Sequence, residues 1–81
     1  KSERWLMLTF EENTHVYFQG DGETPAAFVE VHAFGALSDG PCEKLAGAVC
    51  EILHEELGID PARIYVKFEA TSHWGWNGST L

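Results

Sequence analysis

Apolar and polar residues alternate along three stretches of the chain, at residues 4–11, 26–34 and 63–69. Alternation with a period of two is typical of β-strands with one buried face, because successive side chains point to opposite sides of a strand. A shorter apolar run at residues 15–18 ends in the turn signal Gln-Gly-Asp-Gly at 19–22. The pattern therefore predicts three long strands and one short strand.

A different period runs between the second and third long strands. Aliphatic residues recur there at helical spacing, at Leu45, Ala48, Val49, Ile52, Leu53 and Leu57. Ser38 or Asp39 can cap the start of this helix, because their side chains can accept from its free N–H groups. Gly58 is the expected stop, since glycine adopts the left-handed conformation that commonly ends a helix. An Asp-Pro pair at 60–61 then begins a tight turn with its own cap.

The predicted sheet has two different faces. One face is aliphatic and carries Leu6, Leu8, Phe10, Val29, Val31, Ile64 and Val66. The other face carries Trp5, Phe28, His32, Phe34, Tyr65 and Lys67. A solvated face normally carries threonine, glutamate and lysine rather than this many rings, so we expect something to cover or occupy it. A single helix would also leave the aliphatic face half bare.

The rings of this second face suit an apolar cleft with few charges. They are Trp5, Phe34 and Tyr65, with Trp74 and Trp76 added from the tail and a cation from Lys67. Such a lining is the usual make-up of a small-molecule site. An oligomer interface requires aromatic residues just as much, so composition leaves both interpretations open.

Composition excludes several other function classes. The chain of 81 residues carries 5 basic and 13 acidic side chains, a formal net charge of −8, and no basic stripe that could follow a phosphate backbone. Neither nucleic acid nor an anionic membrane is therefore an expected partner. None of CxxC, HxxxH or HExxH occurs, so we expect no metal, and no cofactor motif is present either.

The two cysteines, Cys42 and Cys50, fall on the predicted helix. Eight residues of helix separate them by roughly 12 Å, which is too far for a disulfide between them. They are therefore interpreted as reduced thiols, which suits a reducing compartment. We expect a cytoplasmic location, with release that uses no signal peptide as the alternative.

Three blocks of sequence carry a resemblance to a known family. They read VHAFG at 31–35, ELGIDPARIYVKF at 56–68 and GWNGSTL at 75–81. In their order and spacing they resemble the macrophage migration inhibitory factor family of the tautomerase superfamily. The resemblance covers residues 1–81 as a single domain, and GWN-x-ST after an RIYV-type strand is its most specific part.

The resemblance implies an α+β fold in which a βαβ unit is repeated, with helices on one face of a mixed sheet. It also implies a homotrimeric barrel, with the sheets inside, the helices outside and active sites between neighbouring subunits. Both anomalies of the pattern then have an explanation. The second sheet face would look into the trimer, and the family's first strand and helix would be expected ahead of Lys1.

The resemblance further implies a reaction, the keto–enol isomerisation of phenylpyruvate- or dopachrome-type substrates. The family's general base is an N-terminal proline, and the three prolines of this chain are all internal. We therefore expect the intact protein to be a tautomerase, and this chain alone to lack the catalytic residue and to be inactive. Two alternatives stay open. One is a non-catalytic binding or cytokine-like protein on the same scaffold, with an undefined receptor, and the other is a natural truncation without catalysis.

Individual residues take roles from the same resemblance. Lys1 matches the lysine that holds the substrate carboxylate, Phe34 an apolar site residue and Tyr65 the tyrosine of the RIYV-type strand. Trp76 matches an aromatic wall, and Lys67 stands where the family often has asparagine and could add a second cation. The substrate, a small aromatic 2-keto acid, is expected to contact Lys1, Trp5, His32, Phe34, Tyr65, Lys67, Trp74, Trp76 and Leu81.

Overall fold

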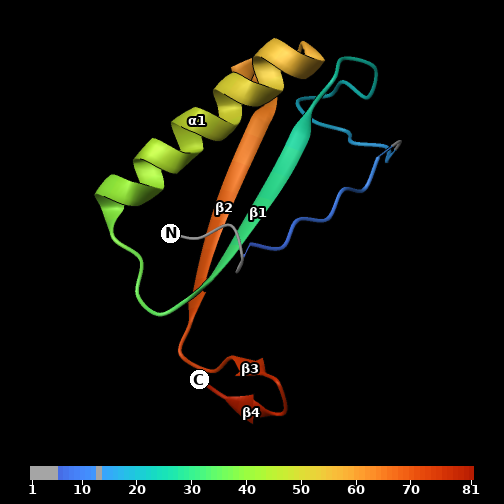
Figure 1. The fold of residues 1–81 in the computed structure, drawn as a ribbon. Helices are drawn as coiled ribbons and strands as arrows, with labels where there is room; N and C mark the ends of the chain where they lie inside the picture. Colours follow the sequence, from blue (N-terminus) through green and yellow to red (C-terminus); the bar gives the residue numbers. More distant parts are fainter. Residues whose placement is uncertain (1–5, 13) are drawn as a thin grey trace.

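The structure is a computed structural model and describes residues 6–12 and 14–81. One helix lies against one side of a pair of long strands, and a small hairpin follows at the far end of the second strand (Figure 1). In chain order the elements are β1 (Ala27–Phe34), α1 (Asp39–Leu57), the 3₁₀ helix η2 (Pro61–Arg63), β2 (Ile64–Thr71), β3 (Gly75–Trp76) and β4 (Ser79–Thr80).

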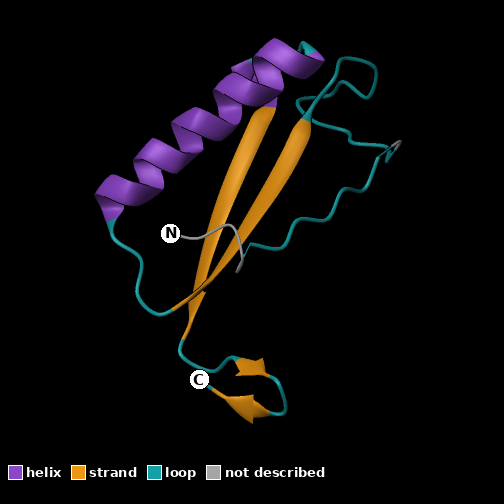
Figure 2. Ribbon diagram, viewed as in Figure 1, coloured by secondary structure: helices purple, strands orange, loops and turns teal. Residues whose placement is uncertain are grey.

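The two long strands and the helix form one βαβ unit. β1 and β2 pair in parallel, with Ala27 opposite Ile64 at one end and Phe34 opposite Thr71 at the other. Parallel neighbours need a long crossover, which α1 supplies (Figure 2). The strands predicted at 26–34 and 63–69 are thus confirmed with small shifts, and the α+β class is confirmed with them.

The end of α1 follows the predicted geometry. Gly58 has a left-handed φ of 67°, and its N–H donates to the carbonyl of His54 at 3.0 Å. The N–H of Ile59 reaches back to the carbonyl of Leu53 at 3.4 Å, which completes a Schellman-type stop. Ser38 caps the start by its extended backbone, without a side-chain hydrogen bond.

No helix in the described part of the chain has the length and apolar character that a membrane crossing requires.

Very little of the molecule is buried. Among the residues that the structure describes, Ile59 at 6%, Arg63 at 8% and Ile64 at 9% are the least exposed. α1 buries none of its side chains, and both Leu45 and Ile52 remain exposed. Burial alternates along β1 as predicted, with half-buried residues between exposed ones. On the predicted aliphatic sheet face, Ile64 is buried and the valines are half-buried, so this face is only partly covered.

The strand predicted at residues 4–11 is wrong in its described part. Residues 6–11 have no regular structure, and Phe10 is 80% exposed. Residues 4 and 5 lie outside the described residues. Alternation gives a segment strand propensity, but a strand also needs a hydrogen-bonded neighbour. Within 6–12 and 14–81 the only long paired strands are β1 and β2, which pair with each other.

The short strand predicted at residues 15–18 is also wrong, whereas the turn that follows it is confirmed. Phe18 and Asp21 exchange two backbone hydrogen bonds of 3.0 Å as an isolated bridge. Gln19 and Gly20 between them both have positive φ, of 54° and 72°. A two-residue loop of this kind turns the chain tightly, and the pairing stops at this single bridge.

A hairpin in the tail was not predicted. Trp76 pairs with Ser79 across Asn77 and Gly78, which have φ of 54° and 82°. Asn-Gly is the strongest short signal for such a turn, because both central residues need positive φ. The N–H of Leu81 then donates to the carbonyl of Trp74 at 2.9 Å and closes the tail on itself.

Candidate functional site

Four residues of the predicted site, His32, Phe34, Tyr65 and Lys67, lie on one face of the β1–β2 pair, hereafter the exposed sheet face. Its members are Phe28, Glu30, His32 and Phe34 from β1, with Tyr65, Lys67 and Glu69 from β2. All of them are exposed, and they alternate with half-buried neighbours for most of each strand. Lys1 and Trp5, which belong to the predicted site, lie outside the described residues.

One end of this face is aromatic. The register places Phe28 opposite Tyr65, and their rings meet edge to face at 6.3 Å. The ring of Phe18, from the loop before β1, lies 5.2 Å from that of Tyr65. Ring pairs at these distances and tilts attract each other, and this attraction adds to the free energy gained by burying their surfaces. Three rings from three segments of the chain therefore converge here.

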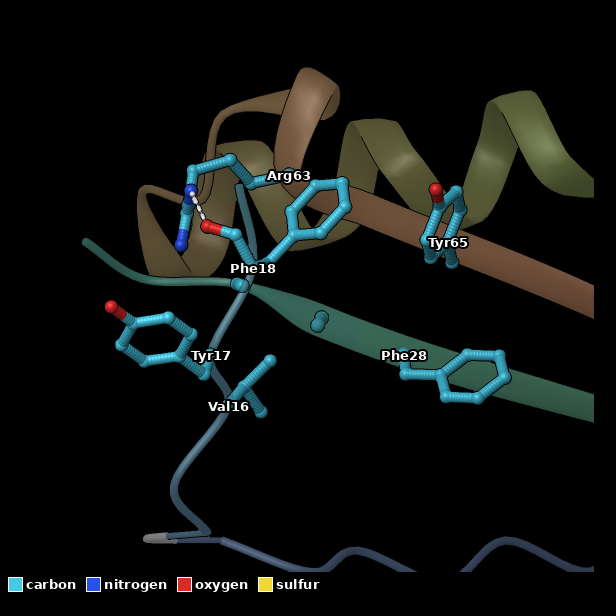
Figure 3. Close-up of a pocket in the computed structure, with 8 residues that line it drawn as sticks. Val16, Tyr17, Phe18, Phe28, Arg63 and Tyr65 are labelled. Atoms are coloured by element: carbon cyan, nitrogen blue, oxygen red, sulfur yellow. Dashed lines mark hydrogen bonds between the residues drawn. The ribbon is translucent and has the colours of Figure 1, made fainter. Parts of the chain in front are cut away.

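These rings border a cavity of about 280 Å³, hereafter the aromatic pocket (Figure 3). It is lined by Val16, Tyr17, Phe18, Ala26, Ala27, Phe28, Arg63 and Tyr65. The lining is almost wholly apolar, and the guanidinium of Arg63 lies 5.5 Å from the centre of the Phe18 ring. The volume suits one ring rather than a large ligand.

The middle of the exposed sheet face is charged. Lys67 Nζ lies 2.7 Å from Glu69 Oε1, and His32 Nδ1 lies 3.5 Å from Glu69 Oε2. His32 Nε2 lies 3.7 Å from Glu30 Oε2. The hydrogen bond from Lys67, and then its charge, lower the pKa of Glu69, and the same contact raises the pKa of Lys67. The charge of Lys67 is thus engaged by Glu69, although both side chains are about half exposed.

Nothing in this cluster arranges metal ligands. Among residues 6–12 and 14–81, no group of three or more histidine, cysteine, aspartate or glutamate side chains could hold a metal ion. The contacts of His32 with Glu30 and Glu69 are instead pairings between side chains on neighbouring positions of the two strands.

Phe34 lies at the opposite end of the exposed sheet face. It stands opposite Thr71, and the chain leaves β2 here for the hairpin that carries Trp74, Trp76 and Leu81, all three exposed. Phe28, opposite Tyr65, is six residues from Phe34 on the same strand. At about 3.3 Å per residue, roughly 20 Å separates the Tyr65 end from the Phe34 end. A single copy of the chain therefore divides the predicted site into two groups.

Sequence reasoning missed two residues that shape the Tyr65 group, namely Phe18 and Arg63. Phe28 was correctly predicted to share a face with Tyr65, but it was not included among the site residues. Phe18 and Arg63 could not have been found, because their contact joins positions 45 residues apart through a loop.

A βαβ unit with one helix, and with rings exposed on one face of its strands, defines an α+β protein. The model of the macrophage migration inhibitory factor (MIF) family matches residues 1–81, and the chain belongs to that family.

Individual relatives agree with this assignment. The chain is 31% identical over 66 residues to macrophage migration inhibitory factor from Meriones unguiculatus, covering 79% of this chain and 56% of that protein. The crystal structure of the homologue from Prochlorococcus marinus is 36% identical, with a TM-score of 0.86, and covers 99% of this chain and 71% of its own. The crystal structure of MIF2 from Leishmania major is 34% identical, with a TM-score of 0.78. The match covers 84% of this chain and 58% of that chain. The chain thus spans little more than half the length of the curated relative.

Proposed function

We propose that the intact protein is a keto–enol tautomerase that acts on a small aromatic 2-keto acid of the phenylpyruvate type. Membership of the MIF family, within the tautomerase superfamily, supports the reaction class. The aromatic pocket beside Tyr65 supports a substrate with a ring, because an apolar hollow lined by rings binds ring-bearing ligands.

The observation that carries the proposal is the division of the predicted site. Phe34 and Tyr65 project from the same face but lie about 20 Å apart along it, and a keto acid with one ring is much shorter than that distance. A site that uses both residues must therefore take Phe34 from one copy and Tyr65 from another. A head-to-tail contact of this kind closes into a ring when the rotation between copies allows it, and we propose a homotrimer.

The proposed chemistry depends on a proton acceptor and a dry site. In the tautomerase superfamily that acceptor is an N-terminal proline amine, and the three prolines of the given sequence are all internal. The amine would take a proton from the carbon next to the keto group while Lys1 holds the carboxylate. The electron pair of the broken C–H bond would move to the keto oxygen through the new C=C bond, and the amine would return the proton to that oxygen to give the enol. Rings from Tyr65 and Trp76 would exclude water, which keeps the amine uncharged and strengthens the attraction to Lys1. Lys67, paired with Glu69, would contribute less charge than its position suggests.

The test uses the full-length protein. Ultraviolet absorbance should follow the enol–keto equilibration of phenylpyruvate at an enhanced rate, and light scattering should give three times the subunit mass. Acetylation of the N-terminal amine should abolish the activity while the mass stays unchanged. A trimer that binds phenylpyruvate without turnover would instead favour the non-catalytic binding protein on the same scaffold. A monomer at micromolar concentration would contradict the shared site.

A further inference from the structure

Arg63 is the one charged side chain among the three least exposed residues of the described chain. Its Nε donates to the carbonyl of Pro25 at 3.1 Å, and its Nη1 donates to the carbonyl of Phe18 at 3.1 Å. Its Nη2 donates to the carbonyls of Asp21 and Thr24, each at 3.1 Å. All four acceptors belong to the loop before β1, so one guanidinium holds that loop against the start of β2.

The loop is also ordered from within by Asp21. Its carboxylate accepts from the N–H of Glu23 at 2.8 Å, the N–H of Thr24 at 3.1 Å and the Thr24 hydroxyl. The hydroxyl contact first, then the two N–H groups, lower the pKa of Asp21 to about 2. The contacts of Asp21 therefore give the loop a defined conformation, and the contacts of Arg63 fix its position relative to the start of β2.

Phe18 connects this loop to the proposed site. Its carbonyl accepts from Arg63, its ring lies beside the guanidinium, and the same ring lies 5.2 Å from Tyr65 (Figure 3). Arg63 and Tyr65 are two residues apart on the chain. Moving the loop away from Arg63 would therefore move the Phe18 ring away from Tyr65 and open one wall of the aromatic pocket.

Arg63 is not placed to bind a substrate carboxylate. Three of its nitrogens already donate to main-chain carbonyls, and Nη1 lies 3.9 Å from the Asp21 carboxylate. Only 8% of the residue is exposed. Its part in the site is to place other groups, which a lysine could not do equally well, because a single ammonium lacks the planar fork of donors.

We infer that Phe18 determines specificity for aromatic over aliphatic 2-keto acids, and that Arg63 is the positioning residue that seats it against Tyr65. The inference rests on the proposed function, since it concerns the substrate class of the same site. The carboxylate and keto group are shared by both classes of acid, whereas only the aromatic class offers a ring to the wall that Phe18 and Tyr65 form.

The experiment compares Phe18→Leu, Arg63→Lys and the double variant in the full-length protein, with Lys44→Arg on the exposed surface of α1 as the charge-preserving control. For each we would measure kcat and KM with phenylpyruvate and with the aliphatic acid 4-methyl-2-oxopentanoate. Each single variant should lower the aromatic-to-aliphatic ratio of kcat/KM about 3- to 10-fold, mainly through KM, as expected for one lost ring contact. The double variant should fall no further than the larger single effect, because both changes remove the same wall.

Equal losses of kcat/KM for the two acids would overturn the inference, because Arg63 and Phe18 would then support the fold without affecting specificity. If the losses of the two single variants multiply in the double variant, the positioning role of Arg63 is overturned. If Arg63→Lys fails to fold by circular dichroism, Phe18→Leu still tests the specificity. Calorimetric binding of both acids separates the two proposals: binding without turnover contradicts the tautomerase alone, while wild-type protein that binds neither acid contradicts both.

Discussion

Replacement of Arg63 by methionine should destabilise the protein more than any other single loss of polar contacts in the described chain. Methionine keeps most of the buried stem, so the change removes mainly the four hydrogen bonds to the carbonyls of Pro25, Phe18, Asp21 and Thr24. A hydrogen bond with one charged partner contributes about 1.5–3 kcal/mol. The four are not additive, because the freed carbonyls lie in an exposed loop that water can reach. We expect a net loss of about 2–4 kcal/mol in the free energy of unfolding.

The assay is urea unfolding of the full-length protein, followed by circular dichroism at one fixed protein concentration, since association between copies also stabilises the folded state. Lys44→Met, which removes an exposed cation from α1, is the control and should stay within about 0.5 kcal/mol of wild type. A loss below about 0.5 kcal/mol for Arg63→Met would refute the view that this guanidinium holds the loop.

Three further changes test other contacts. Gly58→Ala should cost about 1 kcal/mol in thermal unfolding, because φ is 67° there and open space around the added Cβ leaves only backbone strain; no loss would contradict the helix stop. The Asp21 carboxyl has its pKa lowered from 3.8 to about 2, so its stabilisation of the loop is complete above about pH 4 and is lost as the pH falls toward 2; an unshifted NMR titration of Asp21 would count against it. Glu69→Gln should lower the pKa of Lys67 toward its ordinary value, since the hydrogen bond to Glu69 and then its charge are the main causes that raise it; an unchanged Lys67 titration would mean that the pair does not form in solution.

The parts of the fold that could be predicted from the sequence are those set by local pattern. β1, α1 and β2 were found because their alternation or helical spacing is strong, and Gly58 because its conformation is a local requirement. Residues 6–11 alternate as well but form no strand, since pairing depends on a neighbour that local pattern cannot supply. The tail hairpin could also have been predicted, because Asn77-Gly78 is a local signal for a two-residue turn with positive φ at both positions.

The candidate site, like the fold, could be predicted only in part. That Phe34, Tyr65 and His32 share one face followed from the period of a strand and is confirmed. Their distance apart did not follow, because only the parallel register shows that Tyr65 lies opposite Phe28 rather than near Phe34. The seating of Phe18 depends on a buried arginine that no pattern indicates. The roles of Lys1 and Trp5 stay predictions, since both lie outside the described residues.

The central claim is that one site takes Phe34 from one copy and Tyr65 from the next. The most direct measurement is complementation between full-length Phe34→Ala and Tyr65→Ala proteins, unfolded together, refolded as an equal mixture and assayed with phenylpyruvate. Each variant alone should be nearly inactive. In mixed rings about one quarter of the interfaces combine two intact residues, so the mixture should recover up to about a quarter of wild-type activity. A mixture no more active than its separate components would contradict a site shared between copies.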